Sequence, residues 1–319
     1  MNVYRGYFLV FPLLMGVSFF NGLKAQADFP RDEYREQYGN KTGWRGEGWN
    51  VPSHWTEFIN YVPALMGPNS LPVPEVPQQI QDHHYVSFGG MRHVMEGDLT
   101  YNPVLTLYYS FKGVAALKVM SVPVERFTMS QELMLERNAY WNFEELNDSR
   151  GDIIVESHFQ VLDWKKKKIK AIARVGLKTA SGGNREMARH TDAPAYYFDL
   201  STRKSWNTGS GWEIGVDGNL GFYAWQLVHR IREQNDAYLY GIQFSAKQKG
   251  TWEMQSSLAG YFGYLDNGDR PLVWRGMVSR AVGNKGFFIE GYGQIGLHDF
   301  EYKSIGAGVK YQFGRPQTM

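Results

Sequence analysis

The sequence predicts an all-β fold: a transmembrane antiparallel up-and-down β-barrel of about 12 strands with an irregular N-terminal extension. Three observations predict it. Segments of about ten residues with alternating apolar and polar side chains recur from residue 83 to residue 313, which is the pattern of membrane barrel strands. The connections between these segments alternate in length. The last segment ends on Phe313, and its edge would promote aggregation unless another strand pairs with it.

Residues 1–27 have the pattern of a signal peptide. Arg5 precedes an uncharged apolar run, residues 8–20, and a small-x-small cleavage site follows at residues 25–27. A membrane anchor is the alternative, but ~20 apolar residues are needed to cross a bilayer as a helix. We therefore expect export and cleavage before Asp28.

The composition excludes several classes of protein. There are no cysteines, so the chain has neither disulfides nor an acylated cysteine anchor. Lys and Arg total 34 and Asp and Glu total 32, and this balance gives no support to nucleic acid as a partner. After residue 27 no apolar run is long enough for a membrane-spanning helix, so crossing a membrane would require strands.

Residues 28–82 form an extension rich in tryptophan, proline, glycine and asparagine. Its prolines prevent a regular helix or central strand after residue 62: Pro63, Pro68, Pro72, Pro74 and Pro77. Its tryptophans indicate that it packs against something: Trp44, Trp49 and Trp55. Two interpretations remain open, a plug inside a larger body and an arm that binds a periplasmic or membrane protein partner.

Period-2 alternation marks the candidate strands of the barrel, residues 83–313: 83–95, 101–111, 115–123, 151–162, 167–179, 196–205, 212–223, 237–247, 251–264, 271–281, 286–296 and 303–313. Their even number is expected of single-chain bacterial barrels. In a closed barrel the last strand pairs with the first, which removes the exposed edge. Residues 314–319 would form a short tail.

The connections predict an orientation. Those after the second, fourth, sixth, eighth and tenth segments are tight: FKG, DWKKKK, WNTGSG, KQKG and GNKG. Those after the third, fifth and seventh are longer, near residues 124–150, 180–195 and 224–236. In bacterial barrels the short turns face the periplasm. We therefore expect both chain ends on the periplasmic side and the protein in the outer membrane, in contact with its lipid.

One parity of these segments is apolar and the other is strongly charged. In the fourth segment, Ile153 and Phe159 alternate with Glu156 and His158. A barrel places the apolar parity against lipid and the polar parity in its lumen. The residues predicted to line the lumen are Glu156, His158, Lys170, Arg174, Asp199, Arg203, Glu213, Asp217, Glu253, Arg275, Glu290 and Lys310.

Alternation alone does not separate a membrane barrel from a secreted β-sandwich. Tryptophans beside the short connections favour the membrane, because tryptophan is enriched at membrane interfaces: Trp164, Trp206, Trp212 and Trp252. The charged parity has two interpretations, since buried charges must be paired or hydrated. One is an ion-pair network across the lumen that closes the barrel, and the other is a narrow wet pore. The similar numbers of acids and bases favour the network.

No catalytic motif stands out, so we expect neither an enzyme nor a bound cofactor or metal. His83 and His84 are adjacent, and side chains of adjacent strand residues point to opposite faces, so they would not share a metal ion. A lipid hydrolase is a minor alternative. It would need a serine within reach of a histidine on a neighbouring strand, and the sequence does not pair Ser157 or another serine with His158.

Residues 151–313 resemble a known family in four short motifs: Gly151-Asp152, LKTASGG at 177–183, YYFDLS at 196–201, and the closing GAGVKYQF at 306–313. The family is the outer-membrane transporter family of the meta-pathway phenol degradation type, within the FadL-like β-barrel superfamily. The resemblance implies a channel for a small hydrophobic or amphipathic molecule. The alternative is a non-transporting structural or docking subunit of an envelope complex, with residues 28–82 contacting its partner.

Overall fold

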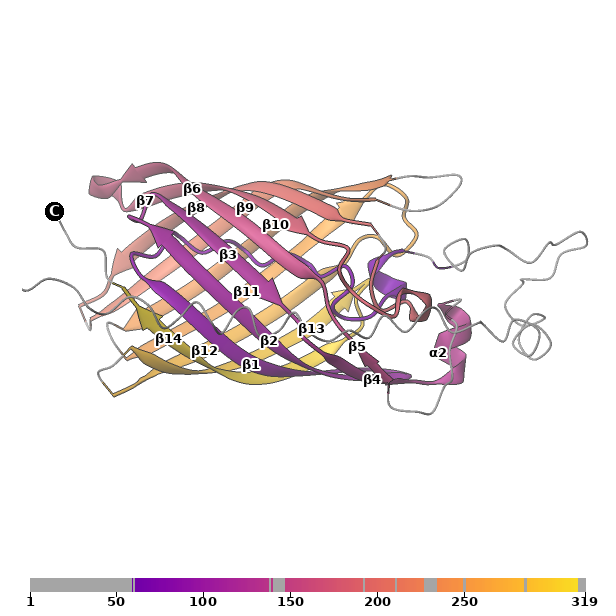
Figure 1. Ribbon diagram of the computed structural model, residues 1–319. Helices are drawn as coiled ribbons and strands as arrows, with labels where there is room; N and C mark the ends of the chain where they lie inside the picture. The colour runs from indigo at the N-terminus through magenta and orange to yellow at the C-terminus, as the bar shows by residue number, and fades with distance from the viewer. Residues whose placement is uncertain are drawn as a thin grey trace, which may run out of the picture. The chain divides into compact units, whose positions relative to one another are not determined.

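The computed structural model describes residues 59, 61–137, 139, 147–191, 193–209, 211–226, 234–248, 251–283 and 286–314. In these residues 12 strands form a closed antiparallel barrel (Figure 1). Its wall consists of β1 (His84–Met95), β2 (Asp98–Phe111), β3 (Ala115–Ser121), β6 (Ile153–Trp164), β7 (Ile169–Lys178), β8 (Ala195–Asn207), β9 (Trp212–Gln226), β10 (Gln234–Gln248), β11 (Trp252–Gly263), β12 (Leu272–Val282), β13 (Phe287–His298) and β14 (Lys303–Phe313). Each overlaps one predicted segment, so the predicted fold class is confirmed.

The barrel closes where β14 pairs with β1. The register runs from His84 opposite Phe313 to Val94 opposite Lys303, and β1 pairs with β2 on its other side. The aromatic end of the last strand therefore has a partner, and the seam leaves no open edge.

The two ends of the barrel differ. The turns after β2, β6, β8, β10 and β12 lie at one end, called here the short-turn end, and the turn after β6 contains the 3-10 helix η4 (Lys165–Lys167). The connections after β3, β7 and β9 lie at the other, the long-loop end, where η5 (Arg185–Met187) follows β7. The alternation of connection lengths read from the sequence therefore separates the two ends correctly.

The predicted loop at residues 124–150 contains regular structure. It includes β4 (Glu125–Met129), α2 (Gln131–Glu136) and β5 (Asn147–Ser149). β4 pairs with the start of β2, and β5 pairs with β4, so this hairpin prolongs the wall at the long-loop end. Among the described residues, no helix has the length and apolar character needed to cross a bilayer.

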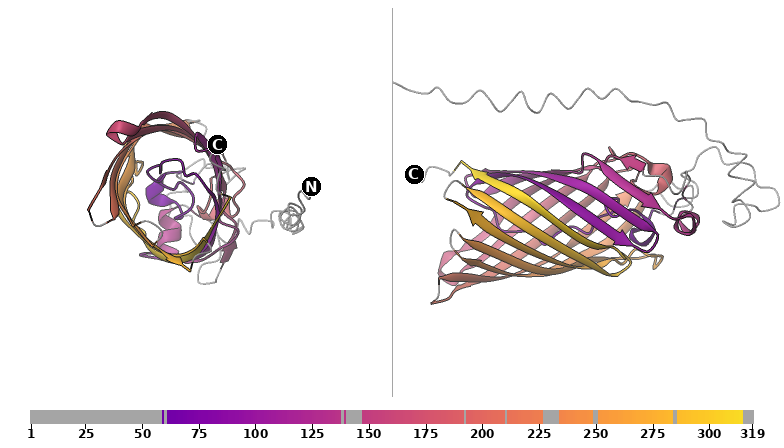
Figure 2. Two further views of the ribbon diagram at one scale, coloured as in Figure 1. Left: turned by 90° about the vertical axis from the view of Figure 1, so that its left-hand side faces the viewer. Right: turned by 90° about the horizontal axis from the view of Figure 1, so that it is seen from below.

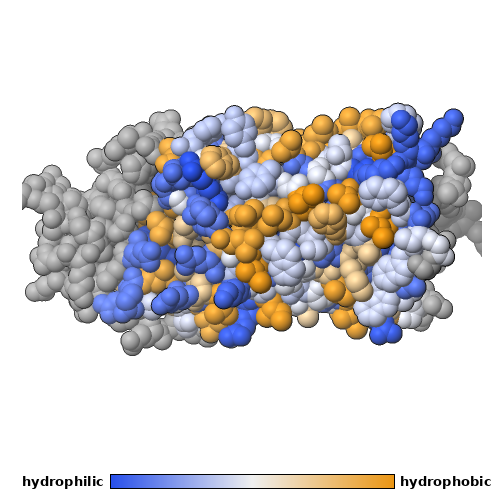
Figure 3. Space-filling view, turned by 180° about the vertical axis from the view of Figure 1, so that it is seen from behind, coloured by the Kyte–Doolittle hydropathy of each residue, from blue (hydrophilic) through white to orange (hydrophobic). Residues whose placement is uncertain are grey.

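Side chains alternate between the two faces of the wall. β8 exposes Phe198 and Leu200 on the outside and buries Tyr197 and Asp199 on the inside. Figure 3 shows apolar side chains spread over the middle of one face and hydrophilic side chains toward its ends. An outer surface of this kind is the one that lipid requires.

Aromatic side chains mark both edges of the apolar band. On β8, Trp206 lies near the short-turn end and Tyr196 near the long-loop end, and both are exposed. The two residues are ten positions apart, which spans ~33 Å along the strand, or ~25 Å along the barrel axis at a tilt of ~40°, the usual height of the band. Near the short-turn end, Lys167 Nζ lies 4.0 Å from the ring centroid of Trp164. Lysines over interfacial tryptophans suit the boundary between lipid and water.

The described part of the extension, residues 61–82, lies inside the barrel (Figure 2). It has one turn of 3-10 helix, η3 (Pro63–Leu65), and no regular element after it, as its prolines predict. Wall side chains satisfy its backbone carbonyls instead: Tyr261 Oη donates to Leu71 O at 3.2 Å, and Arg174 Nη1 donates to Glu75 O at 2.9 Å. The three tryptophans of the extension lie outside the described residues.

The extension passes from one end of the barrel to the other. Tyr61 O accepts from Trp225 Nε1 at 3.0 Å, close to the long-loop end of β9, whereas Gln81 N donates to Tyr108 Oη at 2.9 Å near the short-turn end. At that end Ile80 packs with Tyr108 and Ile172 in a small apolar cluster. The prolines keep the segment extended along the lumen, so Tyr61 and Gln81 lie at opposite ends of the barrel. The expected position of the N-terminal chain end falls outside the described residues.

Candidate functional site

The extension does not fill the lumen. A cavity of about 340 Å³ lies between it and the wall, and all 12 wall strands contribute lining residues. On β1 the lining residues run from Tyr85 to His93, eight residues or ~26 Å along the strand. The lining includes apolar side chains such as Met91 and Val104 and charged ones such as Lys118 and Glu290, so the cavity suits an amphipathic molecule.

Arg174 is the centre of the largest group of predicted lumen residues. Its Nη1 lies 3.0 Å from Glu156 Oε1, and its Nη2 lies 2.5 Å from Asp199 Oδ2. Tyr197 Oη donates to Glu156 Oε1 at 2.7 Å, and His158 Nε2 lies 3.1 Å from the other carboxylate oxygen of Glu156. All five residues are buried. The five residues lie on the neighbouring strands β6, β7 and β8, so these contacts run along the wall and do not cross the lumen.

Other predicted residues are paired in the same way with neighbouring strands. Arg203 Nη1 lies 2.7 Å from Asp217 Oδ2, and its Nη2 lies 3.4 Å from Glu213 Oε1. Lys310 Nζ lies 2.5 Å from Glu290 Oε1. The favoured interpretation of a network across the lumen is therefore wrong in these residues. Adjacent strands bring opposite charges within reach, while the extension and the cavity separate opposite walls.

Three predicted residues lie apart from these groups. Glu253 Oε2 pairs loosely with Lys247 Nζ at 3.7 Å. Lys170 is partly buried near the β6–β7 turn, with no ion pair in the described part of the chain. Arg275 lines the cavity and donates from Nε to Gln294 Oε1 at 2.6 Å and from Nη2 to Val73 O at 2.7 Å.

The sequence analysis missed the charges that fix the extension. Lys118 Nζ lies 3.1 Å from Glu75 Oε2 and 3.8 Å from Glu156 Oε2, so it joins the extension to the Arg174 group. Lys118 is a lone charge among apolar residues of β3, and its parity could have identified it. Glu75 lies in a segment without a period, so no pattern marks it.

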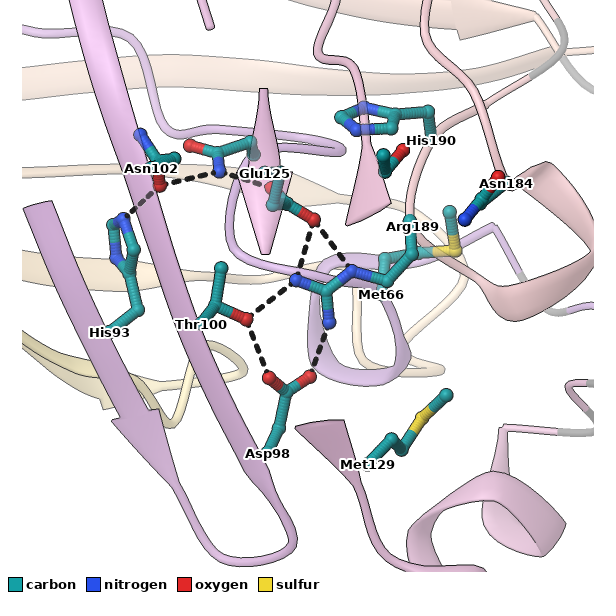
Figure 4. Close-up of polar contacts among 12 residues, drawn as sticks. Met66, His93, Asp98, Thr100, Asn102, Glu125, Met129, Asn184, Arg189 and His190 are labelled. Carbon is teal, nitrogen blue, oxygen red and sulfur yellow. Dashed lines mark hydrogen bonds and ion pairs between the residues drawn. The ribbon is translucent and has the colours of Figure 1, made fainter. Parts of the chain in front are cut away.

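A second buried network closes the long-loop end (Figure 4). Arg189, from the β7–β8 connection, lies with Nη1 2.5 Å from Asp98 Oδ2, and its Nε donates to Glu125 Oε1 at 2.7 Å. Arg137 Nη1 reaches the same Asp98 oxygen at 2.8 Å. Burial alone would lower the pKa of Arg189, but Asp98 and Glu125 raise it above its usual value. The side chains of these four residues are completely buried, so the charges depend on one another.

This network also holds the extension. Asn69 Nδ2 donates to Glu125 Oε2 and, at 3.1 Å, to Asn102 Oδ1. Gly67 N donates to Ala188 O at 2.8 Å, and a Cβ at Gly67 would lie 2.8 Å from Arg189 Cζ. Only glycine therefore lets the extension pass beneath the guanidinium group.

A serine–histidine pair occurs, but not at His158. His93 Nδ1 lies 2.7 Å from Ser304 Oγ, and His93 Nε2 lies 3.0 Å from Asn102 Oδ1. His158 Nδ1 has no partner within the described residues. Ser304 does not line the cavity, and the strand N–H groups beside it are engaged in the β1–β14 ladder. The row of Ser304, His93 and Asn102 therefore satisfies buried polar groups.

No protein-family model and no curated protein matches the chain. Among solved structures, the chain is similar to the KdgM porin at 11% identity, over 72% of this chain and 99% of that one, with a TM-score of 0.43. An outer membrane channel from Pseudomonas putida F1 is 13% identical over 83% and 100%, with a TM-score of 0.48. The transport unit of the autotransporter AIDA-I from Escherichia coli is 9% identical over 77% and 95%, with a TM-score of 0.43.

Proposed function

We propose that this chain is an outer-membrane channel through which a small hydrophobic or amphipathic molecule passes. The observation that carries the proposal is the cavity beside the extension, because it follows most of the length of β1 and has both apolar and charged lining. The closed barrel with its apolar outer band supports membrane insertion. The resemblance of four short motifs to the meta-pathway phenol degradation family supports the ligand class.

The docking alternative finds less support in the described residues. Met66, Leu71 and Val73 of the extension are buried inside the barrel, as expected of a plug. An arm that binds a periplasmic partner would present such side chains outside the wall.

Uptake through reconstituted barrels tests the proposal. Ser87 lines the cavity, whereas its neighbour Phe88 is 56% exposed on the outer face. Ser87→Trp should reduce entry of a small aromatic or medium-chain compound at least several-fold, because indole would occupy part of the cavity. Phe88→Trp changes an outward side chain of the same strand and should leave entry unchanged. Equal uptake by both variants and by liposomes without protein would remove the channel proposal.

A further inference from the structure

The turn between β6 and β7 is strongly cationic and contributes nothing to the lining of the cavity. Lys165, Lys166 and Lys167 form η4, and Lys168 follows them. All four side chains are exposed, and none forms an ion pair with another residue of the described ranges. The turn therefore concentrates uncompensated positive charge at the short-turn end.

A β-bulge turns the apolar end of β6 outward. The pairing of β6 with β7 skips Val161, so Leu162 lies opposite Ala171, on the outward parity of β7. Without this bulge Leu162 and Trp164 would have the parity of the buried His158 and would point into the lumen. Their side chains are exposed instead. The bulge therefore extends the apolar outer face of the barrel up to the lysines.

Contacts with β8 hold the turn in place. Lys204 Nζ donates to Lys167 O, and Ser205 N donates to Lys168 O at 3.2 Å. Lys204 Nζ also lies 5.8 Å from the ring centroid of Trp206. Seen along the barrel, the turn projects outward from the wall (Figure 2, left). The lysines are therefore held on the outside of the barrel, beside exposed tryptophans.

We propose that this turn binds the phosphate headgroups of anionic phospholipids in the leaflet at the short-turn end. Leu162 and Trp164 continue the apolar outer band, which places the turn at the membrane surface. Phosphate supplies the negative charge that the lysines lack, and each lysine near an anionic surface strengthens binding roughly fivefold. A zwitterionic headgroup carries its own cation and offers no net charge. The inference concerns the outer face, so it does not depend on passage through the lumen.

Quenching of tryptophan fluorescence by brominated lipids tests the inference. The full-length barrel is reconstituted in phosphatidylcholine vesicles with the same mole fraction of brominated phosphatidylglycerol or brominated phosphatidylcholine. The part of the quenching that Trp164→Phe abolishes reports the lipid beside the turn. Phosphatidylglycerol should associate there about tenfold more strongly than phosphatidylcholine, since several lysines contribute. This preference should shrink in about 1 M NaCl, where the Debye length is ~3 Å.

Two double variants separate the turn from the total charge. Lys165→Gln with Lys166→Gln should reduce the preference at least fivefold, while unchanged quenching by brominated phosphatidylcholine shows that the variant is inserted. Arg92→Gln with Lys303→Gln removes the same charge from exposed side chains near the long-loop end and should leave the preference intact. Equal association of both lipids beside the natural turn, or the same preference in both double variants, would overturn the assignment. Lysine-dependent binding of poly-glutamate to the barrel in phosphatidylcholine, without a preference for phosphatidylglycerol, would assign the turn to an acidic protein instead.

Discussion

Arg189 and Asp98 form a completely buried ion pair, with 2.5 Å between Nη1 and Oδ2, although 91 residues separate them in the sequence. The pair joins the β7–β8 connection to the first residue of β2. Arg189 also bonds Glu125, and Glu125 accepts from Asn69 of the extension. The buried network at the long-loop end therefore holds the extension in the lumen.

Loss of this pair should destabilise the barrel strongly. Arg189→Leu leaves Asp98 with one cation and Glu125 with none of its charged bonds, which costs ~3–5 kcal/mol for a buried group. The exposed pair of Arg126 and Asp148 is the matched control, because both side chains are about 60% accessible. Arg126→Leu should cost at most ~1 kcal/mol. Thermal unfolding in detergent measures both, and similar losses would show that burial does not decide the effect.

Arg174 and Val175 test the register of β7. Arg174 is 1% exposed and Val175 is 55% exposed on the outer face. Arg174→Val leaves Asp199 without its cation and Glu156 with Lys118 at 3.8 Å, so it should lower the unfolding temperature of an inserted barrel. Val175→Arg places a charge against lipid, at ~2–4 kcal/mol at the bilayer midplane and less toward its edges, so it should reduce membrane insertion. Folded and unfolded forms migrate differently on unheated gels. Normal insertion of Val175→Arg would reverse the assignment of the two faces.

The passage of the extension through the lumen can be mapped with single cysteines, because the chain has no cysteine of its own. Ala64 lies at the long-loop end and Asp82 at the short-turn end. A maleimide that cannot cross membranes should label Ala64→Cys in intact cells, and should label Asp82→Cys only after the envelope is opened. Lys112→Cys, in the β2–β3 turn, is the control for the short-turn end. Labelling of Ala64→Cys and Asp82→Cys from the same side would contradict the path described above.

The contact between Asp152 and Lys178 should weaken in acid. Burial would raise the pKa of Asp152, but its neighbours His190, 3.7 Å away, and Lys178, 2.5 Å away, lower it below its usual value. A lowered pKa means that the carboxylate stabilises the fold above its unfolded pKa of ~4 and loses this effect as the pH falls through the folded value. The difference in stability between the natural chain and Asp152→Asn should therefore be full at pH 7 and shrink below about pH 4. A constant difference would show that Asp152 does not titrate with unfolding.

The strands could be predicted from the sequence because period-2 alternation is local and each strand must meet lipid on one face. The polar parity of the same segments also placed Glu156, Arg174 and Asp199 on the lumen side of the wall. Long-range partners could not be predicted. Asp98 lies just before the predicted start of its strand, and Arg189 lies in a connection that has no alternating pattern. Only the folded barrel brings these two residues into contact. Nor could alternation reveal that Tyr61 reaches the opposite end from His84.

The enclosed extension restricts the order of assembly. The strand that follows it, β1, forms the seam with β14, which is the last strand of the wall. If His84 and Phe313 paired first, a chain of some twenty residues would have to be pulled lengthwise through a finished cylinder, past the buried charges around Arg174 and at the long-loop end. Wrapping the sheet around an extension already in place avoids this, so the seam should be the last wall contact to form. Pulsed hydrogen exchange during refolding would detect it as late protection of the β1–β14 amides, and early protection there would show that the cylinder closes before it is filled.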